Sequence, residues 1–152
     1  CEPGTGDPQG EIPAQWYGPD GLVDLLSESD YVLVAAPLTP ETRGMIGRHE
    51  LAACRPHAFV VNVGRGAIFD EQALIAALRS GQIGGVGLDV FAQEPLPRSS
   101  PLWRMENAIL TPHVSGSSTG NSERLSMLFA ENLARYVQGQ PLLNLVKLEC
   151  GY

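Results

Sequence analysis

Four short apolar segments are the most regular feature of the hydrophobic pattern. They are rich in β-branched residues and do not alternate with polar ones, which is typical of parallel strands covered on both faces. The segments are Tyr31–Ala36, Ala58–Val63, Gly84–Val90 and Ala108–Thr111. The pattern therefore predicts four strands of a parallel sheet rather than hairpin strands.

Helical spacing of apolar residues separates these strands. In two segments, leucine and alanine recur on one helical face directly after an aspartate suited to cap the helix. These residues are Leu22, Leu25 and Leu26 after Asp20, and Leu74, Ala77 and Leu78 after Asp70. Gly81 is placed to end the second helix. Alternation of strand and helix predicts βαβ units, hence an α/β fold with a doubly wound parallel sheet and right-handed crossovers.

The two ends of the chain differ from this pattern. Residues 1–20 are rich in glycine and proline and lack apolar periodicity, so they are predicted to form loops. Residues 118–138 form a predicted amphipathic helix that Gly139-Gln-Pro141 ends. Its apolar face consists of Leu125, Leu128, Phe129, Leu133 and Val137. We expect the partner surface of that face to lie elsewhere than on the sheet.

Composition narrows the class of protein. The 152 residues hold ten Lys plus Arg against seventeen Asp plus Glu, a net charge of −7, which disfavours nucleic acid as a partner. No apolar run approaches about 18 residues, so no membrane span is expected. The sequence has no signal-peptide pattern, and we expect a cytoplasmic protein. Cys1, Cys54 and Cys150 are odd in number and form no Cys-x-x-Cys, which predicts reduced thiols rather than disulfides or a zinc site.

Three polar stretches follow the second, third and fourth strands: residues 62–66, 88–95 and 111–116. Ligands of open α/β sheets bind outside the carboxyl ends of the strands, so Arg65, Glu94 and His113 are expected around one crevice. A cation, a carboxylate and an imidazole there indicate a substrate clamp, an orienting group and a general acid/base. Each also has a plain structural interpretation: Arg65 and Asp89 as turn residues, and Glu94 before Pro95 as part of a surface linker.

Four motifs together carry a family resemblance. They are Pro37-Leu-Thr-Pro-Glu-Thr42, Asn62-Val-Gly-Arg-Gly66, Gly87-Leu-Asp-Val-Phe91 through Glu94-Pro95, and Thr111-Pro-His113. In this order and spacing, the chain from about Tyr17 to Tyr152 resembles the D-isomer-specific 2-hydroxyacid dehydrogenases. Ser100-Pro-Leu-Trp103 and Gly151-Tyr152 are most similar to the glyoxylate and hydroxypyruvate reductase-like members.

The resemblance implies a role for individual residues. His113 would exchange a proton with the substrate oxygen, Glu94 would hold and stabilise the imidazolium, and Arg65 would grip the substrate carboxylate; these three form the expected catalytic set. Asp89 would lie beside the nicotinamide carboxamide. The expected cofactor-binding residues are Ala36, Val63, Gly64, Arg65, Asp89, His113, Val114, Ser115 and Gly116. Gly64 departs from the Ala or Ser of many members, a change that we expect to be conservative.

The resemblance also implies what surrounds this chain. Residues 1–117 would be the C-terminal portion of a Rossmann-like NAD(P)-binding domain. Residues 118–152 would be a C-terminal helix and tail that return to a substrate domain outside this sequence. The expected reaction is hydride transfer between NAD or NADP and a small 2-keto or 2-hydroxy acid, without a metal, in a homodimer when full length. The 152-residue chain alone is expected to be inactive. Two alternatives remain open: an NAD(H)-sensing corepressor-like binding protein and an inactive truncated product.

Overall fold

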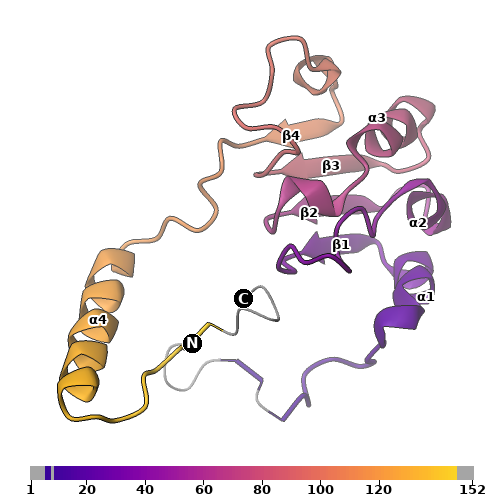
Figure 1. The fold of residues 1–152 in the computed structure, drawn as a ribbon. Helices are drawn as coiled ribbons and strands as arrows, with labels where there is room; N and C mark the ends of the chain where they lie inside the picture. The colour runs from indigo at the N-terminus through magenta and orange to yellow at the C-terminus, as the bar shows by residue number, and fades with distance from the viewer. Residues whose placement is uncertain (1–5, 8, 147–152) are drawn as a thin grey trace.

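Four parallel strands lie side by side in the order in which they follow one another along the chain (Figure 1). The computed structural model describes residues 6–7 and 9–146. The strands are β1 (Tyr31–Val34), β2 (Phe59–Asn62), β3 (Gly85–Leu88) and β4 (Ala108–Leu110). All four predicted strands are confirmed, each shorter than predicted because the ends of the apolar runs belong to the flanking loops.

The α-helices are α1 (Leu22–Glu28), α2 (Arg48–Ala53), α3 (Glu71–Ser80) and α4 (Asn121–Val137), and the short 3-10 helices are η1 (Pro19–Gly21), η2 (Gly66–Ile68) and η3 (Pro101–Arg104). The two helices predicted from the leucine spacing are confirmed as α1 and α3, whereas α2, which connects β1 to β2, was not predicted. The Asp70 carboxylate accepts the N–H groups of Gln72 and Ala73, each at 3.0 Å, and so caps α3. Gly81 ends α3 with a left-handed φ of 71°. Asp20 lies inside η1, and α1 begins after Gly21 instead.

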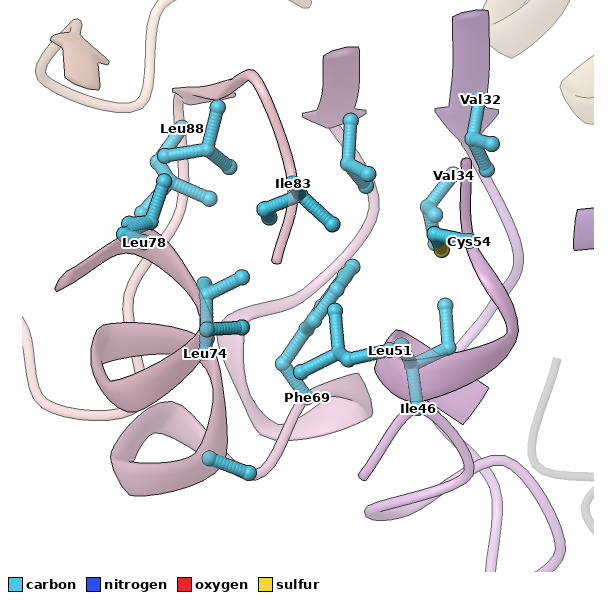
Figure 2. Close-up of a cluster of buried hydrophobic side chains, with 14 of the residues drawn as sticks. Val32, Val34, Ile46, Leu51, Cys54, Phe69, Leu74, Leu78, Ile83 and Leu88 are labelled. Atoms are coloured by element: carbon cyan, nitrogen blue, oxygen red, sulfur yellow. The ribbon is translucent and has the colours of Figure 1, made fainter. Parts of the chain in front are cut away.

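The core lies between one face of the sheet and the first three helices (Figure 2). Leucines of α2 and α3 meet valines of the strands there, with Ile46, Phe69 and Ile83 filling the layer between them. Cys54 belongs to this core as a buried free thiol, and burial raises its pKa. Cys1 and Cys150 lie outside the described residues.

The other face of the sheet is open at its two edge strands. Tyr31 and Leu33 of β1 and Ile109 of β4 are 82%, 67% and 63% exposed. The expectation that both faces of every strand are covered is therefore wrong for β1 and β4 within the described residues. A parallel sheet whose strands follow chain order has crossovers in one direction, which places the crossover helices on one face. The parallel, Rossmann-like α/β fold class itself is confirmed.

Helix α4 lies apart from the sheet (Figure 1). None of its residues is buried, and its apolar positions Leu125, Phe129, Leu133 and Val137 are all exposed. The predicted amphipathic helix is confirmed, and what its apolar face contacts stays a prediction. Within the described part of the chain, no helix combines the length and the apolar character needed to cross a bilayer.

Candidate active site

The loop after β2 is built around a buried asparagine. Asn62 ends the strand with 1% of its surface exposed. Its Oδ1 accepts the N–H of Gly64, and its Nδ2 donates to the carbonyl of Arg65, both at 3.0 Å. The guanidinium of Arg65 stays exposed and donates from Nη1 to the carbonyl of Gly64 at 2.7 Å. Asn62 therefore fixes a tight turn that carries Arg65 at the carboxyl edge of the sheet.

Two glycines let this loop approach its neighbours closely. A Cβ at Gly64 would lie 2.7 Å from the carbonyl oxygen of Ala36, in the loop after β1. A Cβ at Gly66 would overlap the backbone of Phe91 and Ala92, in the loop after β3. The loops after β1, β2 and β3 are thus in backbone contact, which brings their side chains to one edge.

An imidazole and a carboxylate meet across the next two loops. His113 Nδ1 lies 2.8 Å from Glu94 Oε2, and Glu94 Oε1 accepts the N–H of Phe91 at 3.0 Å. The hydrogen bond with His113 lowers the pKa of Glu94 below its usual 4.5, and the Phe91 N–H and the positive charge of Arg65 act in the same direction. An ionised carboxylate can only accept, so Nδ1 carries the shared proton and Nε2 is the nitrogen left for proton exchange.

The backbone of His113 adopts a conformation that residues other than glycine rarely take. Its φ is 55°, in the left-handed region. The N–H of His113 donates to the carbonyl of Asp89 at 2.8 Å. The loop after β4 is therefore tied at this residue to the end of β3.

The Asp89 carboxylate holds the same loop through hydrogen bonds to its backbone. Its Oδ1 accepts from the Thr111 hydroxyl at 2.5 Å and from the Val114 N–H at 2.9 Å, and its Oδ2 accepts from the Ser115 N–H at 2.9 Å. Burial tends to raise the pKa of Asp89, which is 3% exposed, but these hydrogen bonds outweigh it and lower the pKa well below the usual 3.8. Asp89 is therefore an anion at neutral pH, and its carboxylate holds Thr111, Val114 and Ser115.

Two cavities open at this edge of the sheet. The first, of about 580 Å³, is lined by Ala35, Ala36, Pro37, Leu38, Val63, Gly64 and Arg65. The second, of about 670 Å³, is lined by Phe91, Glu94, Pro95, Leu96, Trp103, Leu110, Thr111, Pro112 and His113. The first is lined by small and apolar side chains together with Arg65. In the second cavity, the imidazole of His113 lies among mainly apolar side chains.

The predicted site residues divide into four groups. Ala36, Val63, Gly64 and Arg65 line the first cavity, and Glu94 and His113 line the second. Asp89 is buried between the loops. Val114, Ser115 and Gly116 are exposed on the continuing loop and line neither cavity. In the described ranges, no three His, Cys, Asp or Glu side chains come together as they would around a metal ion.

Sequence reasoning missed the groups that fix these positions. Asn62, Gly66 and Thr111 stand inside the motifs, but nothing in the pattern shows that they hold the loops. One available signal was a polar residue at the end of an apolar strand, which is costly to bury without partners and so indicates a local hydrogen-bond role for Asn62.

Comparison with known proteins identifies relatives of this arrangement. Residues 7–115 match the family described as D-isomer specific 2-hydroxyacid dehydrogenase, NAD binding domain. Among curated proteins, a glyoxylate reductase of Aeropyrum pernix is 45% identical over 128 residues, covering 84% of this chain and 38% of its own length. A glyoxylate/hydroxypyruvate reductase B of Pectobacterium carotovorum is 42% identical over 125 residues, covering 82% of this chain and 39% of its own. This chain thus spans well under half of these relatives.

Solved structures share the fold closely. A D-isomer specific 2-hydroxyacid dehydrogenase from Xanthobacter autotrophicus Py2, in complex with NADPH and MES, superposes with a TM-score of 0.84 at 44% identity, covering 90% of this chain and 56% of that one. An NADPH-dependent glyoxylate/hydroxypyruvate reductase from Sinorhizobium meliloti, in complex with NADP and sulfate, gives 0.83 at 35% identity, covering 90% and 44%. With its fold, its motifs and the match over residues 7–115 in agreement, the chain belongs to the D-isomer-specific 2-hydroxyacid dehydrogenase family, in its NAD-binding domain.

Proposed function

We propose that this chain supplies the catalytic and nicotinamide-binding residues of an NAD(P)-dependent oxidoreductase that interconverts small 2-keto acids and D-2-hydroxy acids, of the size of glyoxylate or hydroxypyruvate. The observation that carries the proposal is the hydrogen bond of 2.8 Å between His113 and Glu94 at the mouth of an apolar cavity. An imidazole backed by an ionised carboxylate is suited to donate and accept a proton repeatedly. The names of the relatives support this class of substrate.

His113 is the general acid in the proposed reduction. The nicotinamide, when bound, supplies the hydride. Nε2 of His113 donates a proton to the carbonyl oxygen of the substrate, and in the oxidation direction it takes that proton back. Glu94 acts as a positioning residue, since its bond to Nδ1 leaves Nε2 facing the substrate.

Arg65 is the proposed clamp for the substrate carboxylate. One guanidinium nitrogen bonds to the Gly64 carbonyl, which holds the planar group against its own loop. The remaining N–H donors are available for two parallel bonds to a carboxylate, a geometry that the fork of arginine matches and the point charge of lysine does not. The positive charge of Arg65 is among the influences that lower the pKa of Glu94, which supports assigning both residues to one substrate site.

The cofactor contacts and the domain boundaries belong to the same proposal. Ala36, Val63 and Gly64 form the wall on which NAD or NADP rests, while Val114, Ser115 and Gly116 present backbone on its other side. Asp89 sets the position of that backbone. Residues 1–117 act as part of the NAD(P)-binding domain, and residues 118–152 contact a substrate domain. The complete enzyme forms a homodimer.

A chimeric reductase tests the proposal. Residues 17–146 of this chain replace the corresponding segment of the Aeropyrum pernix glyoxylate reductase, and loss of NADH or NADPH absorbance with glyoxylate and hydroxypyruvate is measured. We expect turnover that H113A lowers by about 10²–10⁴-fold, the range for a positioned general acid. The matched H49A variant, in an exposed histidine of α2, should keep full turnover.

Two results would count against the proposal. Equal turnover of the H113A and unsubstituted chimeras would remove His113 from the chemistry. Binding of NADPH by a folded chimera without any turnover would favour the NAD(H)-sensing binding protein instead. The unfolding temperature of each variant distinguishes both results from simple failure to fold.

A further inference from the structure

A second group of cations lies outside the proposed active site. Arg79, Arg98 and Arg104 line one cavity of about 410 Å³, together with Ser99, Ser100 and Met105. Arg79 comes from the last turn of α3, Arg98 from the loop after β3, and Arg104 from η3. Three of the ten Lys and Arg residues of an acidic chain therefore gather at one hollow.

None of these three arginines has an ion-pair partner within the described part of the chain. Other arginines do, such as Arg55 with Asp30 and Arg135 with Glu131. Arg79, Arg98 and Arg104 are exposed and have neither an ion pair nor a hydrogen bond to a side chain among these residues. Like charges around one cavity repel each other, so the cluster is stabilised most by an anion bound among them.

Helix electrostatics explain only one of the three. A cation in the last turn of an α-helix is favoured by the helix dipole, which accounts for Arg79 in α3. Arg98 belongs to no helix, and Arg104 stands in a helix of four residues. The convergence of all three on one cavity is therefore not a by-product of helix capping.

The lining indicates the class of ligand. Guanidinium groups bind oxyanions through paired N–H donors, and serine hydroxyls add further donors. Ser100 Oγ accepts the N–H of Leu102 at 3.4 Å, which leaves its own hydrogen free to donate. The cavity has no aromatic wall for a base or ring. We propose that this cavity binds a compact phosphate-type anion, either inorganic phosphate or the phosphate group of a small metabolite.

Trp103 of η3 is a fluorophore next to the arginine cavity, so binding there can be measured by fluorescence. Trp103 lines the cavity of His113, while the adjacent Arg104 lines the arginine cavity. The indole Nε1 donates to the Pro97 carbonyl at 2.9 Å, so Trp103 reports on the segment that carries Arg98. The chain has two tryptophans, and the W16F variant leaves Trp103 as the single fluorophore.

The test is calorimetric titration of the 152-residue chain with sodium phosphate, and separately with glycerol phosphate, at constant ionic strength. We expect saturable binding at one site, with Trp103 fluorescence of the W16F variant saturating over the same concentrations. The R98Q and R104Q variants should each bind about tenfold more weakly, as expected for loss of a charge-assisted hydrogen bond. R48Q, which removes an exposed arginine of α2, should bind unchanged.

The outcomes separate the proposal from general charge attraction. Saturable binding of both ligands shows that the cavity accepts a phosphate group attached to a small metabolite, and binding of sodium phosphate alone identifies the free ion. The proposal is overturned if binding does not saturate, if R104Q binds as tightly as the unsubstituted chain, or if R48Q weakens binding equally. Circular dichroism checks the fold of each variant, and R104K, which keeps the charge, should retain more affinity than R104Q.

Discussion

Hydrogen bonds hold both the side chain and the backbone of His113. Glu94 fixes its ring, and the carbonyl of Asp89 fixes its N–H. A left-handed backbone in a residue other than glycine costs about 1–3 kcal/mol and persists only where its surroundings over-determine it. Here the Asp89 carboxylate supplies that constraint by binding the residues on both sides of His113. The position of the imidazole therefore depends on an anion that need not touch the substrate.

The first prediction concerns this anion and pH. The folded pKa of Asp89 lies below its usual 3.8, so its stabilising contribution is complete above that value and is lost as pH falls through the lower, folded pKa. D89N should lower the free energy of unfolding at pH 7 by about 1–3 kcal/mol, since it leaves backbone N–H donors with a weaker partner. It should also flatten the decline of stability below about pH 4.

Urea unfolding of the chain at pH 7 and pH 3 measures both effects. D20N, in an exposed aspartate of η1, is the matched control and should keep the pH dependence of the unsubstituted chain. An identical decline in D89N and the unsubstituted chain would show that Asp89 titrates no differently in the folded state.

The second prediction separates charge from shape at Arg65. In the chimeric reductase, R65K keeps the positive charge but loses the planar fork, so KM for glyoxylate should rise and kcat should fall. We expect kcat/KM to drop by about 10–100-fold while the Kd for NADPH changes by less than about twofold. Steady-state kinetics and a fluorescence titration with NADPH measure these quantities.

The matched change R48K, in α2, should alter neither quantity. Full activity of R65K would make Arg65 a turn residue, as one reading of the sequence allows. A large loss of NADPH affinity would instead assign Arg65 to the cofactor site.

At the scale of the elements, the loop after β2 depends on the absence of side chains. The resemblance treats Gly64 as a conservative replacement for Ala or Ser, but in this chain a Cβ there would lie 2.7 Å from the carbonyl of Ala36. G64A should therefore destabilise the fold by about 1–3 kcal/mol, the usual cost of overpacking. G18A is the control, because a Cβ at Gly18 meets nothing within 4 Å. Chemical unfolding that ranks G64A at or above G18A in stability would contradict the close approach.

Most of the elements were predictable because each of these has a local signal. Short apolar runs bounded by turn residues favour strands, and Asp70 and Gly81 mark the two ends of α3. The meeting of Glu94 and His113 also followed from the sequence, since both come after neighbouring strands of a parallel sheet.

What covers each face of an element is not a local property. The apolar side chains of Tyr31 and Leu33 predict that both residues are buried. In the structure they lie on the open face of β1. The Asp89 clamp was missed because it requires residues 111–115 to turn back over the end of β3. The arginine cavity was missed for the same reason, since its three cations come from separate elements.

At the scale of the whole molecule, α4 lies apart from the sheet that carries the candidate site (Figure 1). The groups proposed for catalysis all lie at the carboxyl edge of one sheet, whereas α4 stands apart and buries none of its residues (Figure 1). The two are joined by residues 111–120, of which only the first part is clamped by Asp89. Residues 116–120 are small or polar and exposed. The hydrogen bonds described for the Asp89 carboxylate reach only as far as Ser115.

The last prediction follows from where the Asp89 clamp ends. Exposed stretches of small polar residues are preferred sites of proteolytic nicking. Brief digestion with a protease of broad specificity should cut the chain first within residues 116–120, releasing α4 and leaving a resistant fragment that retains His113 beside Glu94. Mass spectrometry of the fragments locates the cut. In D89N the first cut should spread upstream into residues 112–115, so the boundary of resistance to the protease would move with the loss of one buried carboxylate.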